Sequence, residues 1–313
     1  MDRVGVHLPG RGNIHAISRI PASDLLKYNH NVVSNNATVF VPAVSLRILM
    51  VFGKATFDAW ELNFDQLKES VLDFMRRAVL PCLKNGDRIF ESACGMGLNL
   101  YATLEILQEE AGISNITVYG NEYLEANVPK ATTLLTKLLE KQPNANPKNT
   151  VGGICKGDSS DLSFVPANSF DLVFTGYASP LWDPLKLQAT NAEEFDSTVK
   201  TMCNAANFGD RTAQNLVQEM QNRQEDWFSN WYKQMIRIAK PGAPVIVEEV
   251  APPLCCEKLN DWGGVSKEFW RTGVMRYGWD VDPSTLEFGT RAKKYFNQRY
   301  NVFMRKNGRR TDL

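Results

Sequence analysis

The sequence predicts a doubly wound α/β domain, and three observations lead to that prediction. Short apolar runs alternate with longer amphipathic runs between about residues 65 and 250. The apolar runs are hydrophobic on both faces, as in "SFDLVFTGY", which is typical of parallel strands that helices cover on both sides. Glycines and acidic residues follow several of these runs, and the ligands of such sheets bind at the carboxyl ends of the strands.

The apolar runs give the expected strands, and the runs between them give the expected helices. Strands are predicted at "DRIFES", "NITVYGNE", "GGICKGD", "SFDLVFTGY" and "APVIVEEV". Helices are predicted from Phe64 to Pro81, at "LNLYATLEILQEE" up to Gly112, at "ANVPKATTLLTKLLEKQ" with Pro129 near its start, and at "EDWFSNWYKQMIRIAKPG". The segment "LEFGTRAKKYFNQRYNVFMRK" predicts a closing hairpin.

The domain organisation follows from the stretches that interrupt this rhythm. Residues 1–60 are irregular and form an expected N-terminal arm or cap, while residues 61–313 form the domain. Residues 183–225 are polar, helix-prone and too long for a simple connection, so they are read as a helical insertion. We expect the arm and the insertion to close over a bound ligand. A surface ornament or a dimer contact is the alternative for the insertion, which leaves the chain a monomer or a homodimer.

The composition limits which classes of binding partner and which cellular location are expected. Lys plus Arg and Asp plus Glu both number 35, so the formal net charge is zero and a nucleic-acid partner is not expected. No apolar run approaches the roughly 20 residues that span a bilayer, so no membrane partner is expected either. The six cysteines show no metal-binding spacing, which indicates reduced thiols, no metal site and a cytoplasmic location. The nearly acid-free stretch between Asp2 and Asp24 leaves organelle targeting open.

The turn between the first strand and the following helix carries the most specific pattern, "ESACGMG". A dinucleotide fingerprint would need a third glycine after Gly97, and a P-loop would need Gly-Lys-Ser/Thr. The stretch instead resembles the first motif of the class I S-adenosylmethionine-dependent methyltransferases, which reads acid-x-Gly-x-Gly-x-Gly. Glu91 takes the place of the acid, Gly95 and Gly97 take the last two glycines, and Ala93 replaces the first.

The resemblance extends over about residues 65–250. "VYGNEYLEANV" looks like the second motif, a strand that ends in Glu122, and "GDSSDLSFVPANSFDLVFTGY" looks like the third and fourth motifs. The resemblance implies a Rossmann-like methyltransferase sheet, mostly parallel with an antiparallel last strand and with helices on both faces. It also implies S-adenosyl-L-methionine as the cofactor.

Each motif residue has a physical role in that interpretation. Glu91 suits the cofactor's ammonium group, and backbone N–H groups near Gly95 and Gly97 suit its carboxylate. Glu122 can accept from both ribose hydroxyls, and Asp158 can accept from the adenine amino group. Taken singly, each residue has a structural explanation as well, such as a tight turn or a helix cap. The predicted cofactor-binding set is Glu91, Ala93, Cys94, Gly95, Gly97, Asn121, Glu122, Tyr123, Gly157, Asp158, Ser159 and Thr175.

The acceptor is less well defined by the sequence. The stretch "TGYASPLWDP" after the fourth strand lacks the Asn/Asp-Pro-Pro-Tyr pattern of methyltransferases that act on bases. Aromatic faces attract a cationic sulfonium by roughly 0.5–2 kcal/mol, which makes aromatic side chains the natural walls of the pocket. The predicted pocket residues are Tyr177, Trp182 and Trp262, and the predicted catalytic residues are Tyr177, His30 and Tyr28. A thioether or a deprotonated acceptor needs only positioning and exclusion of water, not a base.

These observations predict S-adenosylmethionine-dependent methyl transfer to an N, O or S atom of a small molecule. A likeness to algal enzymes that S-methylate thioether acids gives one specific acceptor class. The alternatives are a protein methyltransferase, an aminopropyltransferase, and a non-catalytic scaffold that keeps the fold.

Overall fold

The computed structural model describes residues 76, 79–123, 125–142, 148–175, 192–256, 264–290 and 300–308. The expected arm at residues 1–60 and nearly all of the helix expected from Phe64 to Pro81 lie outside these ranges. The described part falls into two compact units. One contains residues 192–227, 251–256 and 264–266, and the other contains the rest.

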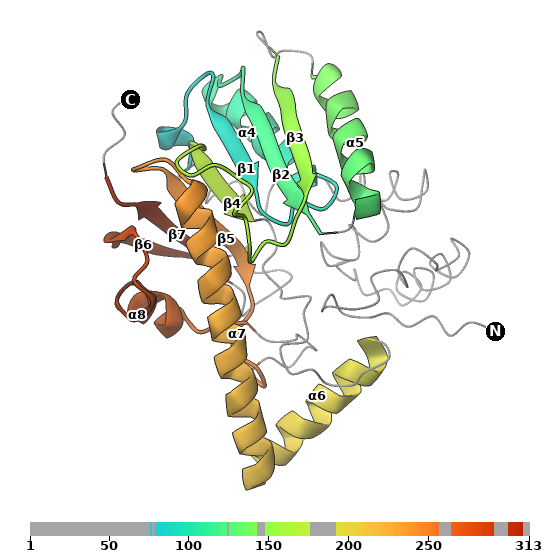
Figure 1. The fold of residues 1–313 in the computed structure, drawn as a ribbon, viewed down its shortest axis with the longest axis vertical. Helices are drawn as coiled ribbons and strands as arrows, with labels where there is room; N and C mark the ends of the chain where they lie inside the picture. The colour runs from blue at the N-terminus through green and yellow to red at the C-terminus, as the bar shows by residue number, and fades with distance from the viewer. Residues whose placement is uncertain are drawn as a thin grey trace, which may run out of the picture. The chain divides into compact units, whose positions relative to one another are not determined.

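A seven-stranded sheet forms the centre of the larger unit, with the strand order β3-β2-β1-β4-β5-β7-β6 (Figure 1). Strands β1 to β5 pair in parallel with one another, and β7 pairs antiparallel with both β5 and β6. The predicted fold class and the antiparallel last strand are thereby confirmed. The strands are β1 (Arg88–Glu91), β2 (Thr117–Glu122), β3 (Thr150–Lys156), β4 (Leu172–Thr175), β5 (Pro244–Val250), β6 (Val281–Thr290) and β7 (Tyr300–Lys306).

Helices connect the parallel strands. Figure 1 shows α4 behind the sheet and the C-terminal part of α7 in front of it. Helix α4 begins after Gly97 and ends at Gly112, and both glycines have the left-handed backbone that marks a turn into or out of a helix. The helices are α4 (Leu98–Ala111), α5 (Val128–Glu140), α6 (Ala192–Asn207), α7 (Arg211–Ile238) and α8 (Lys267–Tyr277), with short 3-10 turns η3 (Leu80–Cys82) and η4 (Glu125–Asn127).

Two helices differ from the sequence prediction. The helix expected to start near Glu225 is the C-terminal part of α7, which begins at Arg211 inside the predicted insertion. The polar residues before Glu225 hid this continuity, because the apolar face becomes regular only further along the chain. Helix α8 (Lys267–Tyr277) was not predicted, and it buries Phe269, Trp270 and Gly273.

The core of the larger unit combines the sheet with an aromatic cluster from α7, α8 and the short connection between α8 and β6. The ring of Tyr232 lies 5.1 Å from that of Trp270 and 4.9 Å from that of Trp279, edge to face in both cases. Such contacts add about 0.5–1.5 kcal/mol per pair beyond the burial of area. Gly273 is necessary beneath this cluster, because a Cβ there would lie 2.4 Å from the Trp279 ring.

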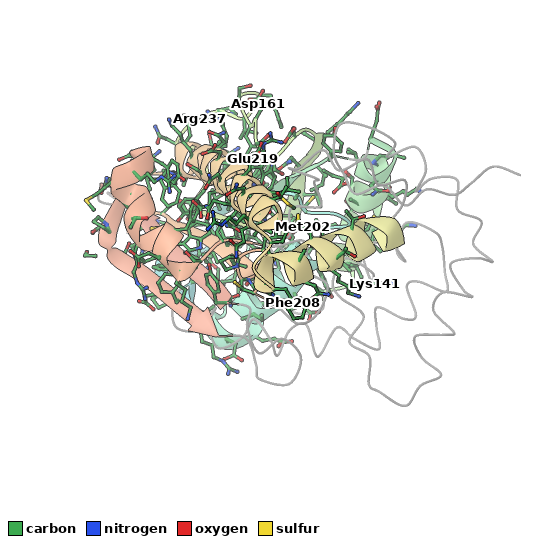
Figure 2. All side chains as sticks on the ribbon, turned by 90° about the horizontal axis from the view of Figure 1, so that it is seen from below. Lys141, Asp161, Met202, Phe208, Glu219 and Arg237 are labelled. Atoms are coloured by element: carbon green, nitrogen blue, oxygen red, sulfur yellow. A yellow bond between two sulfur atoms is a disulfide. The ribbon has the colours of Figure 1, made fainter. Side chains whose placement is uncertain are left out.

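The end of α7 is fixed by polar contacts to the loop that follows β3. Arg237 donates to the carbonyl of Val165 at 2.9 Å and also to that of Leu162. Asp161, which Figure 2 labels near Arg237, has a carboxyl pKa below its usual range, mainly because Ser163 donates to it and also because Arg237 is near. These contacts order the segment between β3 and β4, which contains no helix.

The described part of the smaller unit contains a helical hairpin, made of α6 and the first part of α7, with its own apolar cluster. Its buried members are Val199, Met202, Met220 and Leu254. The side chain of Gln221 on α7 donates to the Gly264 carbonyl at 3.1 Å and accepts from the Leu254 N–H at 3.0 Å. At the turn between α6 and α7, Phe208 is 92 % exposed (Figure 2).

A disulfide joins Cys203 of α6 to Cys255 in the segment after β5, across a sequence separation of 52 residues. The sequence led us to expect reduced cysteines throughout, and this pair is a correction. No spacing pattern in the sequence could show that the fold brings Cys203 and Cys255 together.

Candidate functional site

The carboxyl ends of β1, β2 and β3 meet at one edge of the sheet. Glu91, the last residue of β1, lies in register with Gly120 of β2, and Glu122, the last residue of β2, lies in register with Lys156 of β3. Parallel pairing therefore brings the acids at the ends of β1 and β2 and the turn after β3 to the same edge, where ligands of doubly wound sheets bind.

The turn after β1 has an unusual backbone. Ala93 and Gly95 have φ values of 55° and 54°, and Gly97 has φ of 77°, so all three are left-handed. For Ala93 this conformation costs roughly 1–2 kcal/mol, which a glycine would not incur. In the motif, Ala93 stands where the family has its first glycine. In the structure, Ala93 has the left-handed backbone conformation that glycine adopts most easily.

The turn is held by neighbouring strands. The Ser92 N–H donates to the Phe174 carbonyl of β4 at 2.8 Å, and the Cys94 N–H donates to the Asn121 carbonyl of β2 at 2.9 Å. Gly120 is required where the turn crosses β2, because a Cβ there would lie 2.8 Å from Cys94 Sγ. The side chain of Cys94 is thus buried against β2.

Asn121 links the three strand ends. Its Oδ1 accepts from the Ala93 N–H at 3.3 Å. Its Nδ2 donates to the Gly157 carbonyl at 3.1 Å and to Ser159 Oγ at 2.9 Å. The oxygen and both amide hydrogens of this buried side chain therefore have protein partners, which suits Asn121 to positioning the two turns.

Glu122 also holds the turn. Glu122 is buried, with 8 % of its surface exposed, and its Oε2 accepts from the Gly95 N–H at 3.1 Å. The Gly97 N–H donates to the Cys94 carbonyl at 2.9 Å. The two backbone groups that the sequence suggested for a carboxylate thus already have partners in the protein.

The neighbouring start of α4 offers donors of the same kind. Among the described residues, no side chain caps the start of α4, and its N-cap Gly97 has no side chain to offer. The first N–H groups of a helix have no partner within the helix, and together with the helix dipole they favour an anion. Gly97 itself is explained by structure, since its backbone is left-handed and a Cβ would lie 3.3 Å from Leu135 of α5.

Glu91 is fully buried, with 0 % of its surface exposed. Its Oε1 accepts from Nδ2 of Asn99, the second residue of α4, at 2.9 Å. A buried carboxylate is stable only when donors or charges surround it. The sequence identified Glu91 but not Asn99, which it placed only at the start of a helix.

The turn after β3 places the remaining predicted residues. Asp158 Oδ1 accepts from the Ser160 N–H at 2.8 Å and from Ser160 Oγ at 2.7 Å, so the carboxylate shapes its own turn. The ring of Phe164 lies against Gly157, where a Cβ would be 2.3 Å from it. Tyr123 and Phe164 are 40 % and 48 % exposed, so apolar ring surface is available after both β2 and β3.

One contact ties the turn after β1 to a distant helix. Trp231 of α7 donates through Nε1 to Ser92 Oγ at 2.8 Å, across 139 residues of sequence, and both side chains are buried. At the end of β4, Thr175 is fully buried. Nothing in the local sequence around Trp231 points to this partner.

The predicted catalytic and pocket residues Tyr28, His30, Tyr177, Trp182 and Trp262 lie outside the described residues. Within the described ranges, no group of three or more His, Cys, Asp or Glu side chains is placed to hold a metal ion. Burial raises the pKa of the Tyr101, Tyr232 and Tyr300 hydroxyls above their usual value, so these tyrosines stay protonated near neutral pH.

The strand order, the antiparallel β7 and the acids that end β1 and β2 occur together in this chain. The fold is that of the class I methyltransferases. The resemblance seen in the sequence is confirmed at the level of the fold. Among the helices that the structure describes, none has the length and apolar character to cross a bilayer.

Comparison with known proteins adds distant structural likeness only. No protein-family model matches this chain, and the curated proteins gave no match. An S-adenosylmethionine-dependent methyltransferase from Aquifex aeolicus is 14 % identical, with a TM-score of 0.40 over 77 % of this chain and 92 % of that one. A methyltransferase of the same description from Methanosarcina mazei is 13 % identical, with a TM-score of 0.41 over 73 % and 96 %. The [4+2]-cyclase SpnF is 14 % identical, with a TM-score of 0.44 over 76 % and 81 %. At these values the assignment of fold rests on the sheet and not on the likeness.

Proposed function

We propose that this chain binds S-adenosyl-L-methionine at the carboxyl edge of β1 to β3 and transfers its methyl group to a small molecule. The observation that carries the proposal is the pair of buried carboxylates, Glu91 and Glu122, at the ends of adjacent parallel strands. A left-handed turn lies between β1 and α4, and it is hydrogen-bonded to β2. A scaffold has no need to bury two acids at the edge where ligands bind.

The chemistry of these groups fits the cofactor part by part. Glu91 would accept from the ammonium group, and the first turn of α4 would receive the carboxylate. Glu122 would accept from the ribose hydroxyls. Asp158 and the backbone of Ser159 would contact the adenine, with Tyr123 supplying apolar surface.

The chain's own contribution to the reaction is positioning and exclusion of water. When bound, the cofactor supplies a methyl group on a positively charged sulfur, and its in-line transfer to N, O or S leaves S-adenosylhomocysteine. Holding the reactants in line contributes several kcal/mol, on the order of 7–11 in the best cases. If the acceptor must lose a proton, Tyr177 after the fourth strand and His30 and Tyr28 in the N-terminal arm are the proposed candidates.

The composition of the chain favours a small molecule as the methyl acceptor. The zero net charge disfavours nucleic acid, and Tyr177, Trp182 and Trp262 are the proposed walls of the acceptor pocket. A thioether acid is the specific acceptor class to test first, because the sequence resembles enzymes of that kind. A protein acceptor is the second candidate.

Calorimetry with three ligands tests the cofactor. S-Adenosylmethionine and S-adenosylhomocysteine should bind, and decarboxylated S-adenosylmethionine should bind at least about tenfold more weakly, because it has no carboxylate for the start of α4. Preference for the decarboxylated form would indicate an aminopropyltransferase. Incubation with methyl-labelled cofactor and pools of thioether acids, other metabolites and proteins then identifies the acceptor. Binding without any labelled product from these pools would indicate a non-catalytic protein.

A further inference from the structure

The contact between Asn99 and Glu91 closes the turn after β1 across its base. Asn99 Nδ2 donates to Glu91 Oε1 at 2.9 Å, and the six residues of the turn lie between the two. Both side chains are buried, with exposed fractions of 6 % for Asn99 and 0 % for Glu91. The start of α4 is therefore attached to the end of β1 through the carboxylate that is proposed to hold the cofactor's ammonium group.

This hydrogen bond restricts the orientation of the carboxylate. The last torsion of a glutamate side chain is broad, so the plane of the carboxylate needs a donor to define it. A donor in a buried site makes a strong bond to an ionised acceptor, because water does not compete. The side-chain amide of Asn99 supplies that donor, and the position of Asn99 in helix α4 gives the amide a rigid support.

The chemical type of the donor matters as much as its place. A carboxamide donates without carrying charge, so it stabilises the ionised carboxylate and leaves its negative charge for a cationic ligand. A lysine or arginine in this position would neutralise that charge. The apolar residues Leu98 and Leu100 flank Asn99 on α4, so a buried amide there is tolerable because it has a partner.

We propose that Asn99 is a positioning residue that orients Glu91 toward the ammonium group and so determines affinity for the amino-acid end of the cofactor. The inference rests on the proposed function of the β1 to β3 edge. It assigns Asn99 no contact with the adenosine part, which the Glu122 and Asp158 side of the edge would bind.

Two ligands separate this role from a merely structural one. S-Adenosylhomocysteine carries the amino-acid end, whereas 5′-methylthioadenosine has the adenosine and thioether parts without it. Asn99→Leu should lower affinity for S-adenosylhomocysteine by about tenfold or more, which is the loss of a charged hydrogen bond. Affinity for 5′-methylthioadenosine should stay within about twofold, because its contacts do not involve Glu91.

Thr103→Val is the matched control, because Thr103 is a buried polar residue one turn further along α4. It should leave the ratio of the two affinities unchanged. If circular dichroism shows that Asn99→Leu does not fold, Asn99→Ser takes its place, and the same ratio of the two ligand affinities is compared with that of the wild type. In a Glu91→Gln background, Asn99→Leu should lower affinity for S-adenosylhomocysteine by less than about threefold, since the two changes remove one interaction.

Equal losses for both ligands would show that Asn99 only attaches α4 to β1, and no loss for either would show that it is unimportant. Fully additive effects of Glu91→Gln and Asn99→Leu would overturn the inference in the same way. If the wild-type chain binds neither ligand, the proposed function fails, and this inference fails with it. The first three outcomes overturn the inference alone.

Discussion

The turn after β1 and the hairpin of α6 and α7 are stabilised by different kinds of interaction. The turn is held by hydrogen bonds from Ser92, Ala93, Cys94 and Gly95 to β4 and to the end of β2. The hairpin is held by a small apolar cluster and the Cys203–Cys255 disulfide. Hydrogen bonds at buried strand ends fix direction and distance, whereas apolar packing and a covalent link mainly supply stability.

This difference indicates which region is built for a ligand. The turn combines left-handed residues, buried carboxylates and an uncapped helix start, and each of these needs compensation from the rest of the fold. The hairpin contains no comparable group of buried acids among its described residues. The predictions below test whether the two regions respond to substitution as this contrast requires.

The largest effect is expected in the hairpin. Cys203→Ser removes a cross-link over 52 residues, and the resulting gain in entropy of the unfolded chain should lower the free energy of unfolding by about 4 kcal/mol. Urea unfolding measures this change, and dithiothreitol should reproduce it with the unchanged chain. Cys155→Ser is the control, because Cys155 is an exposed free thiol. If neither Cys203→Ser nor dithiothreitol changes the midpoint of urea unfolding, the disulfide contributes nothing to stability.

Glu122 is expected to have the next largest effect, on ligand affinity. Glu122→Ala removes the acceptor for the Gly95 N–H as well as the proposed contact to the ribose, so affinity for S-adenosylhomocysteine should fall more than about tenfold. Glu122→Gln keeps an acceptor for Gly95 and removes only the charge, so calorimetry should show a smaller loss. Identical losses would mean that the acceptor for Gly95 is irrelevant to binding, and no loss in either variant would remove Glu122 from the site.

The contact between Trp231 and Ser92 is expected to have an intermediate effect on stability. Trp231→Phe leaves the buried Ser92 hydroxyl without its donor, which should cost about 1–3 kcal/mol in free energy of unfolding. The double variant Trp231→Phe with Ser92→Ala should recover part of that loss, because both polar groups are then absent. Strict additivity in a chemical-denaturation cycle would show that the two side chains are not coupled.

Ala93 should give the smallest effect, and in the opposite direction. Ala93→Gly relieves a left-handed backbone worth roughly 1–2 kcal/mol but increases the entropy of the unfolded chain by about 0.4–1 kcal/mol, so a net stabilisation of about 0.5–1 kcal/mol is expected. Thermal unfolding measures the change. Ala102→Gly, in the interior of α4, should instead destabilise by about 1 kcal/mol or more. A destabilised Ala93→Gly variant would contradict the assigned backbone.

The sequence was sufficient to predict the sheet because its strands are short apolar runs bounded by turn residues. The strand that ends in Glu122 was predicted to its last residue, and the predicted strand "DRIFES" extends one residue beyond Glu91, where β1 ends. The closing hairpin of β6 and β7 was predicted at "LEFGTRAKKYFNQRYNVFMRK", but β6 begins earlier, at Val281. The predicted start of α7, near Glu225, was wrong. The helix begins at Arg211, and polar residues in its first half hid that start.

The candidate site was only partly predictable, for a physical reason. A motif names the residues that are close in sequence, such as Glu91 and Gly95, but not those that folding brings to them. Trp231 reaches Ser92 over 139 residues, and Gly120 matters only because Cys94 packs on it. The pairing of Cys203 with Cys255 depends in the same way on tertiary structure. Asn99 was nearer in sequence, but a polar residue at the start of a helix is too common to indicate a partner.

The central claim is that the buried acid at the end of β1 receives the ammonium group of S-adenosylmethionine. Calorimetric titration of S-adenosylhomocysteine into the wild-type chain and into Glu91→Gln tests it most directly, with circular dichroism to verify folding. We predict saturable binding to the wild type and a loss of about tenfold or more in the variant, because a buried carboxylate makes a charged hydrogen bond that an amide cannot replace. Equal affinity in the two proteins, or no binding to the wild type, would contradict the claim.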